Sequence, residues 1–466
     1  MRTHTCGELN PTHKDQEATL CGWVHRRRDF GKLIFIDVRD RYGITQVVFV
    51  PSVSPAAHAE ASKLGPEFVI KIKGTVGVRS EKNINKEIST GAIELLAKEL
   101  EILNTAKVPV FEIEDRVEAS EDLRLTYRYL DIRRTKVRES LLLRHNLIAS
   151  IRAFLNTQSF VEVETPVLTK STPEGARDFL VPSRLTPGSF YALPQSPQLF
   201  KQILMVSGMD RYYQVVKCFR DEDLRADRQP EFTQLDMELS FVDQDTIFDL
   251  TERMYKQVFK EVLNIDLPIP FPRMTHAEAM AKYNSDKPDI RQDKNNAKEF
   301  AFLWVVDFPL LKYNSDEKRW DSEHHPFTGI NPDDAQYLES GQYEKIRGRC
   351  YDLVLNGNEI GSGSVRIHRR ELQQKIFDII GLDPEETLKR FGFLLRAFEY
   401  GAPPHAGVAY GIDRIVTIIT GNESIRDCIA FPKTQKGTCL MTEAPSEVDQ
   451  KQLKELGILT INTPKK

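Results

Sequence analysis

The residues best suited to chemistry lie in one stretch of the chain, 217–241. Period-two patterns on both sides of a charged loop predict a hairpin of antiparallel strands, with Arg220 and Glu222 on one face of the first strand. The second strand would carry an apolar row and a polar row, the latter Phe232, Gln234, Asp236, Glu238 and Ser240. Arginines and carboxylates gathered in this way favour a polyanion bound with a metal ion. The alternative is a solvated strand face with surface ion pairs.

Three stretches together resemble the signature motifs of the class II aminoacyl-tRNA synthetases. FRDE (219–222), with its loop and the next strand, resembles motif 2, FVEVETPVL (160–168) resembles motif 1, and GIDR (411–414) resembles motif 3. The sequence around motif 2 is similar to that of the bacterial aspartyl-tRNA synthetases, and no HIGH or KMSKS motif of class I enzymes occurs. The resemblance implies an α+β protein whose class II catalytic domain has an antiparallel β-sheet flanked by helices.

The first hundred residues predict a small β-barrel. Apolar stretches near 19–24, 33–38, 44–50, 68–78 and 92–102 are separated by turn residues, with a longer break at 51–66. Five such strands match an OB-fold, whose sheet face binds single-stranded nucleic acid. Phe35 shares its predicted face with two charged residues, so it is either a base-stacking aromatic or a Phe half-covered by a loop.

Length and composition agree with a large enzyme of several domains. With 466 residues, the chain is long enough for about three domains. We expect an anticodon-binding OB-fold at 1–104, a charged hinge at 105–137, and a catalytic domain with a C-terminal extension at 138–466. The net charge of −4 argues against non-specific coating of nucleic acid, so RNA contacts must depend on local basic clusters.

The cellular location is predicted from what the sequence lacks. The six cysteines are scattered without a CxxC pair, which favours reduced thiols in a cytoplasmic protein. No run of about 18 apolar residues occurs, so no membrane span is expected. The N-terminus MRTHTCGELN has no apolar signal region, so we expect no secretion.

The reaction implied by the resemblance is attack of a carboxylate on the α-phosphate of ATP, followed by acyl transfer to a ribose hydroxyl. Because the carboxylate is already ionised near pH 7, catalysis should come from positioning and charge stabilisation by arginines and Mg²⁺. The resemblance gives the catalytic roles to Arg220, Glu222 and Arg414. It assigns Mg²⁺ to Asp352 and Glu359, and ATP binding to Arg220, Asp221, Glu222, Gln229, Phe232, Glu359, Gly411, Ile412, Asp413 and Arg414.

The resemblance also implies an aspartate pocket, which must hold one ammonium and two carboxylates. Lys201 and Arg366 would clamp the side-chain carboxylate. A lysine enzyme would need acidic residues there, and an asparagine enzyme has no use for this double positive clamp. Taken alone, the His324–His325 pair is typical of a surface loop. The complete aspartate-binding set implied by the family is Glu174, Ser196, Gln198, Lys201, Arg220, Asp236, His324 and Arg366.

Contacts with tRNA and with a second subunit are implied by the same resemblance. Phe35 would stack in the anticodon, with Arg28 and Gln46 donating hydrogen bonds to its bases. Phe30 and the loop at Lys82 would influence the choice between tRNA(Asp) and tRNA(Asn), and Phe30 resembles the discriminating type. Motif 1, ending at Pro166, implies a homodimer.

One departure from the family lies between motifs 2 and 3. Bacterial members carry an inserted domain after a string like YNSDKPDIR, but here only QDKNNAKEF follows before FLWVVDFPL. We expect a short linker near 290–300 in its place and activity to survive. Three alternatives stay open: an enzyme that also charges tRNA(Asn), an amino-acid-activating paralogue, which would usually lack the barrel, and a non-catalytic tRNA-binding descendant, which would be expected to lose Arg220 or Arg414.

Overall fold

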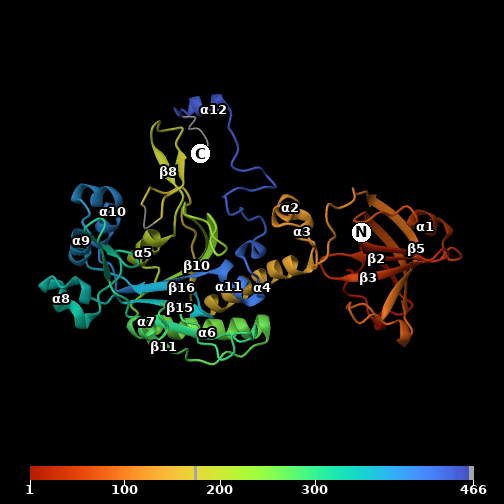
Figure 1. Ribbon diagram of the computed structural model, residues 1–466, viewed down its shortest axis with the longest axis horizontal. Coiled ribbons are helices and arrows are strands. Elements are labelled where there is room, and N and C mark those ends of the chain that lie inside the picture. Colours follow the sequence, from red (N-terminus) through yellow and green to blue (C-terminus); the bar gives the residue numbers. More distant parts are fainter. Residues whose placement is uncertain (173–175, 461–466) are drawn as a thin grey trace. The chain divides into compact units, whose positions relative to one another are not determined.

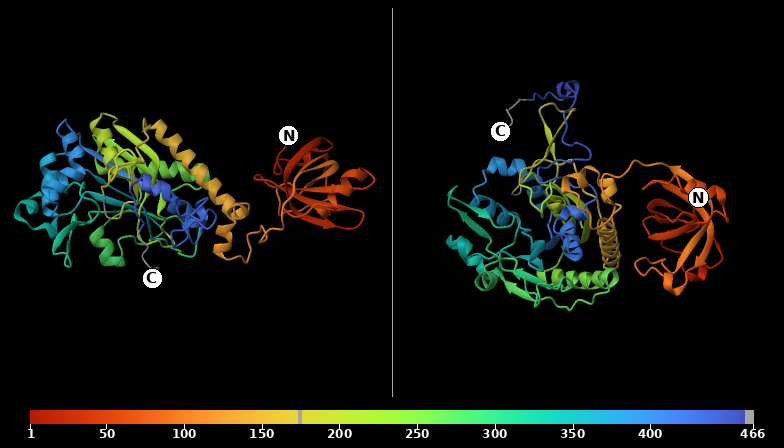
Figure 2. Two further views of the ribbon diagram at one scale, coloured as in Figure 1. Left: turned by 90° about the horizontal axis from the view of Figure 1, so that it is seen from above. Right: turned by 45° about the vertical axis from the view of Figure 1, so that its right-hand side comes forward.

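The computed structural model describes residues 1–172 and 176–460 and divides the chain into two compact units, Met1–Arg138 and Glu139–Lys466. Each unit has its own hydrophobic core, and Figures 1 and 2 show the helices and strands of each unit as ribbons. In these residues, no helix combines the length and the apolar character that a membrane span requires.

The first unit is built around a closed five-stranded barrel with the strand order β1-β2-β3-β5-β4. Inward-facing side chains such as Leu20, Ile36 and Leu95 alternate with outward ones and form one buried cluster. The predicted OB-fold barrel is therefore confirmed. Its strands are β1 (Glu17–Asp29), β2 (Ile34–Arg39), β3 (Ile44–Phe49), β4 (Val69–Val78) and β5 (Ile93–Asn104).

The predicted break at 51–66 contains a helix, α1 (Pro55–Ala61). Ser54 caps it by accepting a hydrogen bond from the Ala57 N–H, and Pro55 fits its first turn. Alanines at 57 and 61 are buried against the barrel core.

The segment that follows the barrel is held to it by buried charge. Glu67 accepts hydrogen bonds from Arg39 at 2.8 Å and from Arg133 at 2.6 Å, and the Arg133 guanidinium lies 4.8 Å from the centre of the Trp23 ring. Two short helices, α2 (Glu121–Thr126) and α3 (Arg128–Asp131), belong to this segment. The structure thus groups residues up to Arg138 with the barrel, while a hinge at 105–137 stays a prediction.

The second unit contains an eight-stranded sheet with the order β11-β12-β15-β16-β17-β10-β9-β6. Its neighbours are antiparallel except at the two edges, where β11 pairs with β12 and β6 with β9 in parallel. The strands are β6 (Val161–Glu162), β9 (Arg211–Phe219), β10 (Glu231–Ser240), β11 (Arg273–Thr275), β12 (Phe302–Val306), β15 (Cys350–Leu355), β16 (Asn358–Val365) and β17 (His405–Gly411). The predicted antiparallel sheet flanked by helices is confirmed.

The remaining elements of this unit are helices and two small hairpins. The hairpins pair β7 (Leu180–Pro182) with β8 (Phe190–Ala192) and β13 (Leu311–Asn314) with β14 (Arg319–Ser322). The helices are α4 (Thr135–Thr157), which starts in the first unit, α5 (Gln198–Val206), α6 (Gln244–Leu263), α7 (His276–Tyr283), α8 (Ala335–Ser340), α9 (Arg370–Ile379), α10 (Pro384–Phe398), α11 (Ile412–Thr420) and α12 (Gln450–Glu455). Its short 3-10 helices are η3 (Pro332–Asp334), η4 (Tyr343–Lys345) and η5 (Ile425–Cys428), while η1 (Pro11–His13) and η2 (Glu81–Asn83) belong to the first unit.

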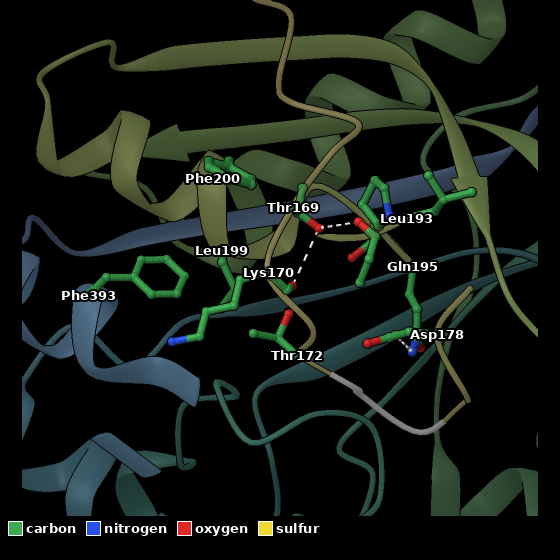
Figure 3. A pocket seen from close by; sticks show the side chains of 12 residues that line it. Thr169, Lys170, Thr172, Asp178, Leu193, Gln195, Leu199, Phe200 and Phe393 are labelled. Carbon is green, nitrogen blue, oxygen red and sulfur yellow. Dashed lines mark hydrogen bonds between the residues drawn. The ribbon is translucent and has the colours of Figure 1, made fainter. Parts of the chain in front are cut away.

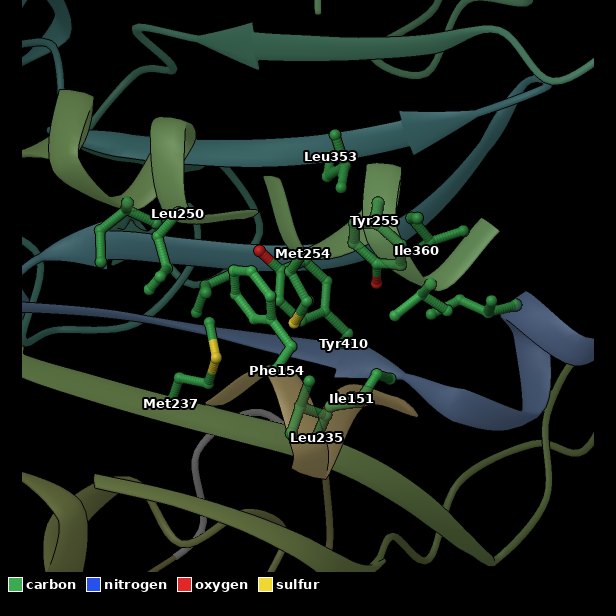
Figure 4. Packing of buried hydrophobic residues seen from close by; sticks show 14 of the residues in the cluster. Ile151, Phe154, Leu235, Met237, Leu250, Met254, Tyr255, Leu353, Ile360 and Tyr410 are labelled. Carbon is green, nitrogen blue, oxygen red and sulfur yellow. The ribbon is translucent and has the colours of Figure 1, made fainter. Parts of the chain in front are cut away.

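The core of the second unit fixes which face of the sheet is available for a site. Leu235 and Met237 of β10 pack with Ile151 and Phe154 of α4 and with side chains of α6, as Figure 4 shows. Because successive strand residues point to opposite faces, Phe232, Gln234 and Asp236 must lie on the other side of the sheet.

The predicted hairpin around the charged loop is confirmed, with two corrections. β9 pairs antiparallel with β10 but ends at Phe219, so Arg220 and Glu222 belong to the loop and not to a strand. The solvated reading of the polar row is also wrong, because Asp236 and Glu238 are fully buried. Buried cations neutralise them, as described next.

Candidate active site

A cavity of about 450 Å³ opens on the polar face of the sheet and is lined by elements far apart in the sequence. The strands β10, β16 and β17 form its floor, and α5, the β9–β10 loop and the start of α11 form its walls. It brings together most of the residues predicted for ATP and aspartate: Ser196, Gln198, Lys201, Arg220, Glu222, Gln229, Phe232, Asp236, His324, Glu359, Arg366, Gly411, Asp413 and Arg414.

Among the described residues, three that were predicted are not in its lining: Asp221, Ile412 and Asp352. Glu174 lies outside the described residues. The Asp221 N–H donates to the Arg177 carbonyl at 3.1 Å, and the side chain of Ile412 is buried in the hydrophobic core. Asp352 lies on β15 and is reached from the cavity through His324, whose Nε2 is 3.4 Å from Asp352 Oδ1.

Four buried charges form the innermost part of the cavity region. Lys201 contacts the carboxylates of Asp236 and Glu238, the second at 3.3 Å. Arg366 donates from Nε and Nη2 to the two oxygens of Glu238 at 2.9 and 3.1 Å. With two cations and two carboxylates, the formal charges of this quartet cancel, which is the condition for burying them at low energetic cost.

The two carboxylates of the quartet differ in their surroundings. Burial alone would raise the pKa of Glu238, but Arg366 and Lys201 lower that pKa overall. For Asp236, burial prevails over the opposing charge of Lys201, and its pKa is raised. Asp236 Oδ2 accepts no hydrogen bond from the described part of the chain, so it is a buried acceptor available to a ligand that donates.

Glu238 was not predicted as a site residue. The available signal was its place on the polar row of β10, next to Asp236. Its partner Arg366 lies 128 positions further along the chain, which no local pattern reveals.

Arg366 turns its remaining nitrogen toward two further polar groups. Nη1 donates to Ser364 Oγ at 2.7 Å and lies 2.8 Å from His325 Nε2. Burial, followed by the charge of Arg366, lowers the pKa of His325 well below its ordinary value. Although burial opposes it, hydrogen bonds to Asp352 and Cys350 raise the pKa of His324. The surface-loop reading of this histidine pair is therefore wrong.

Three glycines of β16 and β17 pack closely against neighbouring chain segments, and two of them, Gly361 and Gly363, line the cavity. A Cβ on Gly407 would lie 1.8 Å from Glu238 Oε2, and one on Gly363 would lie 2.3 Å from the Gly407 carbonyl oxygen. A Cβ on Gly361 would lie 2.3 Å from the Tyr410 ring. Glycine is needed at these positions because neighbouring chain segments occupy the space of a side chain.

Two arginines mark the end of the cavity expected to bind ATP. The Arg220 guanidinium lies 5.1 Å from the centre of the Phe232 ring, and its buried Nε has no hydrogen-bond partner in the residues described. Arg414 donates to the Glu359 carbonyl and lies 3.7 Å from the Asp227 carboxylate. Positive charge beside an aromatic face suits a nucleotide, with phosphates on the arginines and a base on the ring.

Two acidic residues, Asp352 and Glu359, fit a divalent cation. Burial raises the pKa of Glu359, and the nearby charge of Asp352 raises it further. A cation between them would relieve this repulsion with the hard oxygen ligands that Mg²⁺ prefers. Across 1–172 and 176–460, no group of three or more His, Cys, Asp or Glu side chains is arranged to hold a metal, so such an ion would need oxygens from a ligand as well.

A second cavity of about 50 Å³ adjoins the first and shares Gln195 and Ser196 with it. Figure 3 shows Gln195 beside Asp178 and below Thr169 and Leu193. The Gln195 amide donates to the Ala176 carbonyl at 2.7 Å and to Asp178 Oδ1 at 2.6 Å. Gln195, which sequence reasoning missed, therefore fixes Ala176, a residue of the main cavity's wall.

Comparison with known proteins identifies this architecture. A family model described as tRNA synthetases class II (D, K and N) matches residues 120–435, and one for the OB-fold nucleic acid binding domain matches 18–103. The chain belongs to the class II tRNA synthetases. An Aspartate--tRNA(Asp/Asn) ligase of Dictyoglomus turgidum is 44% identical, with 99% of this chain and 98% of that protein covered. Another, of Oleidesulfovibrio alaskensis, is 46% identical, with 98% and 95% covered.

Solved structures support the same fold for this class II synthetase. The asparaginyl-tRNA synthetase of Pyrococcus horikoshii with asparaginyl-adenylate superposes with a TM-score of 0.75 at 24% identity, covering 92% of this chain and 98% of that one. The aspartyl-tRNA synthetase of Entamoeba histolytica gives 0.72 at 22% identity, covering 92% and 90%.

The barrel of this synthetase brings four of its five predicted tRNA residues together on β1–β3 and the turn after β1. Arg28 donates to Asp37 at 2.7 Å and to Gln46 at 3.1 Å. Phe30 is 71% exposed, and its ring meets the half-buried Phe35 edge-on at 5.7 Å between centroids. The fifth, Lys82, lies apart in η2 after β4.

A buried histidine behind the charge quartet predicts a pH-dependent stability. His405 lies 2.7 Å from the Pro403 carbonyl through Nδ1 and 3.2 Å from Gln202 through Nε2, and burial lowers its pKa. Because the unfolded chain binds this proton more readily, the unfolding free energy should fall as the pH drops below about 6.5 toward the lowered pKa. Urea unfolding of wild type and His405→Gln between pH 5 and 8 measures the contribution. If the difference in unfolding free energy between the two proteins is the same at every pH, the predicted contribution of His405 is wrong.

Proposed function

We propose that this protein is an aspartate–tRNA ligase, which activates L-aspartate with ATP and transfers it to the 3′ end of tRNA(Asp), releasing AMP and pyrophosphate. The observation that carries the proposal is the buried quartet of Lys201, Arg366, Asp236 and Glu238, in a chain that belongs to the class II synthetases. The names of the 44–46% identical relatives support the same substrate.

The quartet accounts for recognition of aspartate by charge. The unpartnered oxygen of Asp236, together with Ser196, Gln198 and Glu174, would accept the ammonium group. Lys201 and Arg366 would bind the side-chain carboxylate, while Glu238 fixes the plane of the guanidinium. A neutral side chain would not make the charge-assisted hydrogen bonds that an aspartate carboxylate makes with these cations, so asparagine should be rejected.

Adenylate formation would depend on positioning and electrostatics. Arg220 would contact the α-phosphate and the α-carboxylate of aspartate, holding the attacking oxygen near phosphorus. Phe232 would stack on adenine, Asp221, Glu222 and Gln229 would lie along the nucleotide, and Arg414, beside Gly411 and Ile412, would hold the γ-phosphate. Asp352 and Glu359 would hold Mg²⁺, which supplies positive charge to the phosphates when bound.

The proposed enzyme could charge tRNA(Asp) alone or both tRNA(Asp) and tRNA(Asn). Phe30 and the Lys82 loop favour an enzyme restricted to tRNA(Asp). The relatives' names, which specify tRNA(Asp/Asn), favour an enzyme that charges both.

We also propose that the chain lacks the inserted domain of its bacterial relatives. The alignment with the Dictyoglomus protein runs over 582 positions, against 466 residues here. The short segment 291–299 closes on itself, since Glu299 accepts hydrogen bonds from the N–H groups of Gln292 and Asp293 at 2.7 and 3.0 Å. Such a closed linker supports a catalytic domain that is complete without the insertion.

A homodimer through motif 1 belongs to the same proposal. Val161, Val167 and Leu168, next to Pro166, are each about half exposed. Exposed apolar side chains in one short stretch of sequence fit an interface with a second subunit.

Charging of purified tRNA(Asp) and tRNA(Asn) with labelled aspartate and ATP–Mg²⁺ tests the function, with asparagine and lysine as competing amino acids. Charging of tRNA(Asp) alone supports the discriminating form, and charging of both tRNAs supports the other. Absence of aspartate charging and of aspartate-dependent pyrophosphate exchange would overturn the proposal.

A mutation in the barrel should affect tRNA charging without affecting the activation of aspartate in the catalytic unit. Phe35→Ala removes the ring proposed to stack on an anticodon base, worth about 1–3 kcal/mol of binding. We expect kcat/KM for tRNA charging to fall by about five- to a hundredfold while aspartate-dependent pyrophosphate exchange is unchanged. Equal loss in both assays would contradict a role confined to tRNA.

A further inference from the structure

Helix α4 is tied by polar contacts to both ends of α11, the helix that presents Arg414 to the cavity. At the start of α11, Arg144 of α4 forms an ion pair with Asp413 Oδ1. Just beyond its end, Asn422 Nδ2 donates to Ser140 Oγ at 3.0 Å, and both of these residues are buried. The order of the contacts shows that the two helices run antiparallel.

Asp413 is the centre of a three-way junction. While Oδ1 is bound by Arg144, Oδ2 accepts a hydrogen bond from the Thr233 N–H of β10 at 2.7 Å. Thr233 follows Phe232, whose ring lines the cavity, and Asp413 precedes Arg414. One carboxylate therefore sets the spacing between the two groups that would hold adenine and the γ-phosphate.

The charge of Asp413 makes this junction depend on Arg144. The Asp413 side chain is only 4% exposed and lines a cavity proposed to bind a polyanion. A buried carboxylate without its cation would repel phosphate groups and attract the neighbouring Arg414 away from them. Arg144, which lies outside the cavity lining, neutralises it.

We infer that Arg144 is a positioning residue for the ATP end of the site, acting through Asp413 on Arg414 and Phe232. The inference rests on the proposed function for the identity of the nucleotide, and on the described contacts for everything else. Neither the family motifs nor the cavity lining includes Arg144.

Binding of Mg²⁺–ATP, measured by calorimetry without aspartate or tRNA, tests the inference. We expect Arg144→Ala to weaken ATP binding by about tenfold or more, as for removal of one partner of a buried ion pair, while KM for aspartate changes less than twofold. Arg144→Lys should retain part of the affinity because it keeps the charge but not the planar donor.

The double variant distinguishes this role from simple loss of packing. Adding Asp413→Asn to Arg144→Ala removes the uncompensated charge but leaves an oxygen for the Thr233 N–H, so ATP binding should recover most of its strength. Arg370→Ala is the matched control, because Arg370 forms an exposed ion pair with Glu399 at 2.9 Å elsewhere in the same unit. It should bind ATP as the wild type does.

Wild-type ATP affinity in Arg144→Ala, or a double variant no better than the single one, would overturn the inference. If Arg144→Ala does not fold, Arg144→Gln and Arg144→Lys carry the comparison, with the larger loss expected for Gln. A wild-type protein that binds ATP but does not activate aspartate would overturn the proposed function and leave the role of Arg144 standing.

Discussion

Arg220→Ala should reduce aspartate-dependent pyrophosphate exchange by on the order of a thousandfold, the loss expected when a preorganised donor to a developing charge is removed. Arg220 directly follows β9, and its buried Nε has no hydrogen-bond partner in the described chain, so its charge is available for a phosphate. Because the Arg220 side chain makes a ring contact with Phe232 and no hydrogen bond to the described residues, the unfolding free energy should change by about 1 kcal/mol or less.

The comparison that makes this result specific is Arg220→Lys. Lysine keeps the charge but cannot contact two oxygens through a planar fork, so it should recover only a minor part of the activity. Arg370→Ala should leave exchange unchanged. An Arg220→Ala enzyme within tenfold of the wild type would remove Arg220 from the catalytic centre.

Gly407→Ala should destabilise the protein by about 3 kcal/mol and lower kcat/KM for aspartate about a hundredfold. The added Cβ would lie 1.8 Å from Glu238 Oε2 and 2.4 Å from the Met237 carbonyl oxygen. Glu238 cannot move freely, because Arg366 and Lys201 hold its carboxylate. Displacing it would disturb the guanidinium that is proposed to bind the substrate. Urea unfolding and steady-state exchange kinetics measure the two effects.

Gly392→Ala is the matched control for Gly407→Ala. Gly392 lies inside α10, where a Cβ would come no closer than 3.4 Å, to the flexible end of Arg396. Alanine favours helix over glycine by up to about 1 kcal/mol, so this variant should be at least as stable as the wild type. If both alanine variants are equally stable and active, the close packing at Gly407 does not constrain the site.

The sequence was sufficient for those parts of the fold that follow from local periodicity. The five barrel strands and the β9–β10 hairpin have alternating sequence patterns, and the burial of β1 reproduces the alternation, whereas β10 is buried on both faces from Leu235 onward. The end of β9 was misplaced, because the alternation continues through Arg220 and Glu222 after the pairing with β10 has stopped. Helix α1 was missed since its small alanines, though partly buried, give no apolar stripe.

Site residues that belong to a short motif could be predicted from the sequence. Contacts between residues far apart in the sequence could not. Short sequence motifs, which can be recognised without knowing the fold, predicted Arg220, Phe232 and Arg414 as site residues. The pairing of Glu238 with Arg366 and of Asp413 with Arg144 joins residues 128 and 269 positions apart. Such contacts are set by the order of strands in the sheet and by helix packing, which periodicity does not specify.

Three closely packed glycines of β16 and β17 limit how this enzyme could acquire a new amino acid specificity. At Gly361, Gly363 and Gly407 any added side chain would overlap neighbouring chain atoms, so substitutions there should abolish the fold or the site and not reshape it. A change of specificity would have to come from other positions, for example Lys201 on α5 and Arg366, which follows β16. A library that randomises the walls and leaves the three glycines fixed would therefore contain a larger share of folded enzymes than one that randomises the whole cavity.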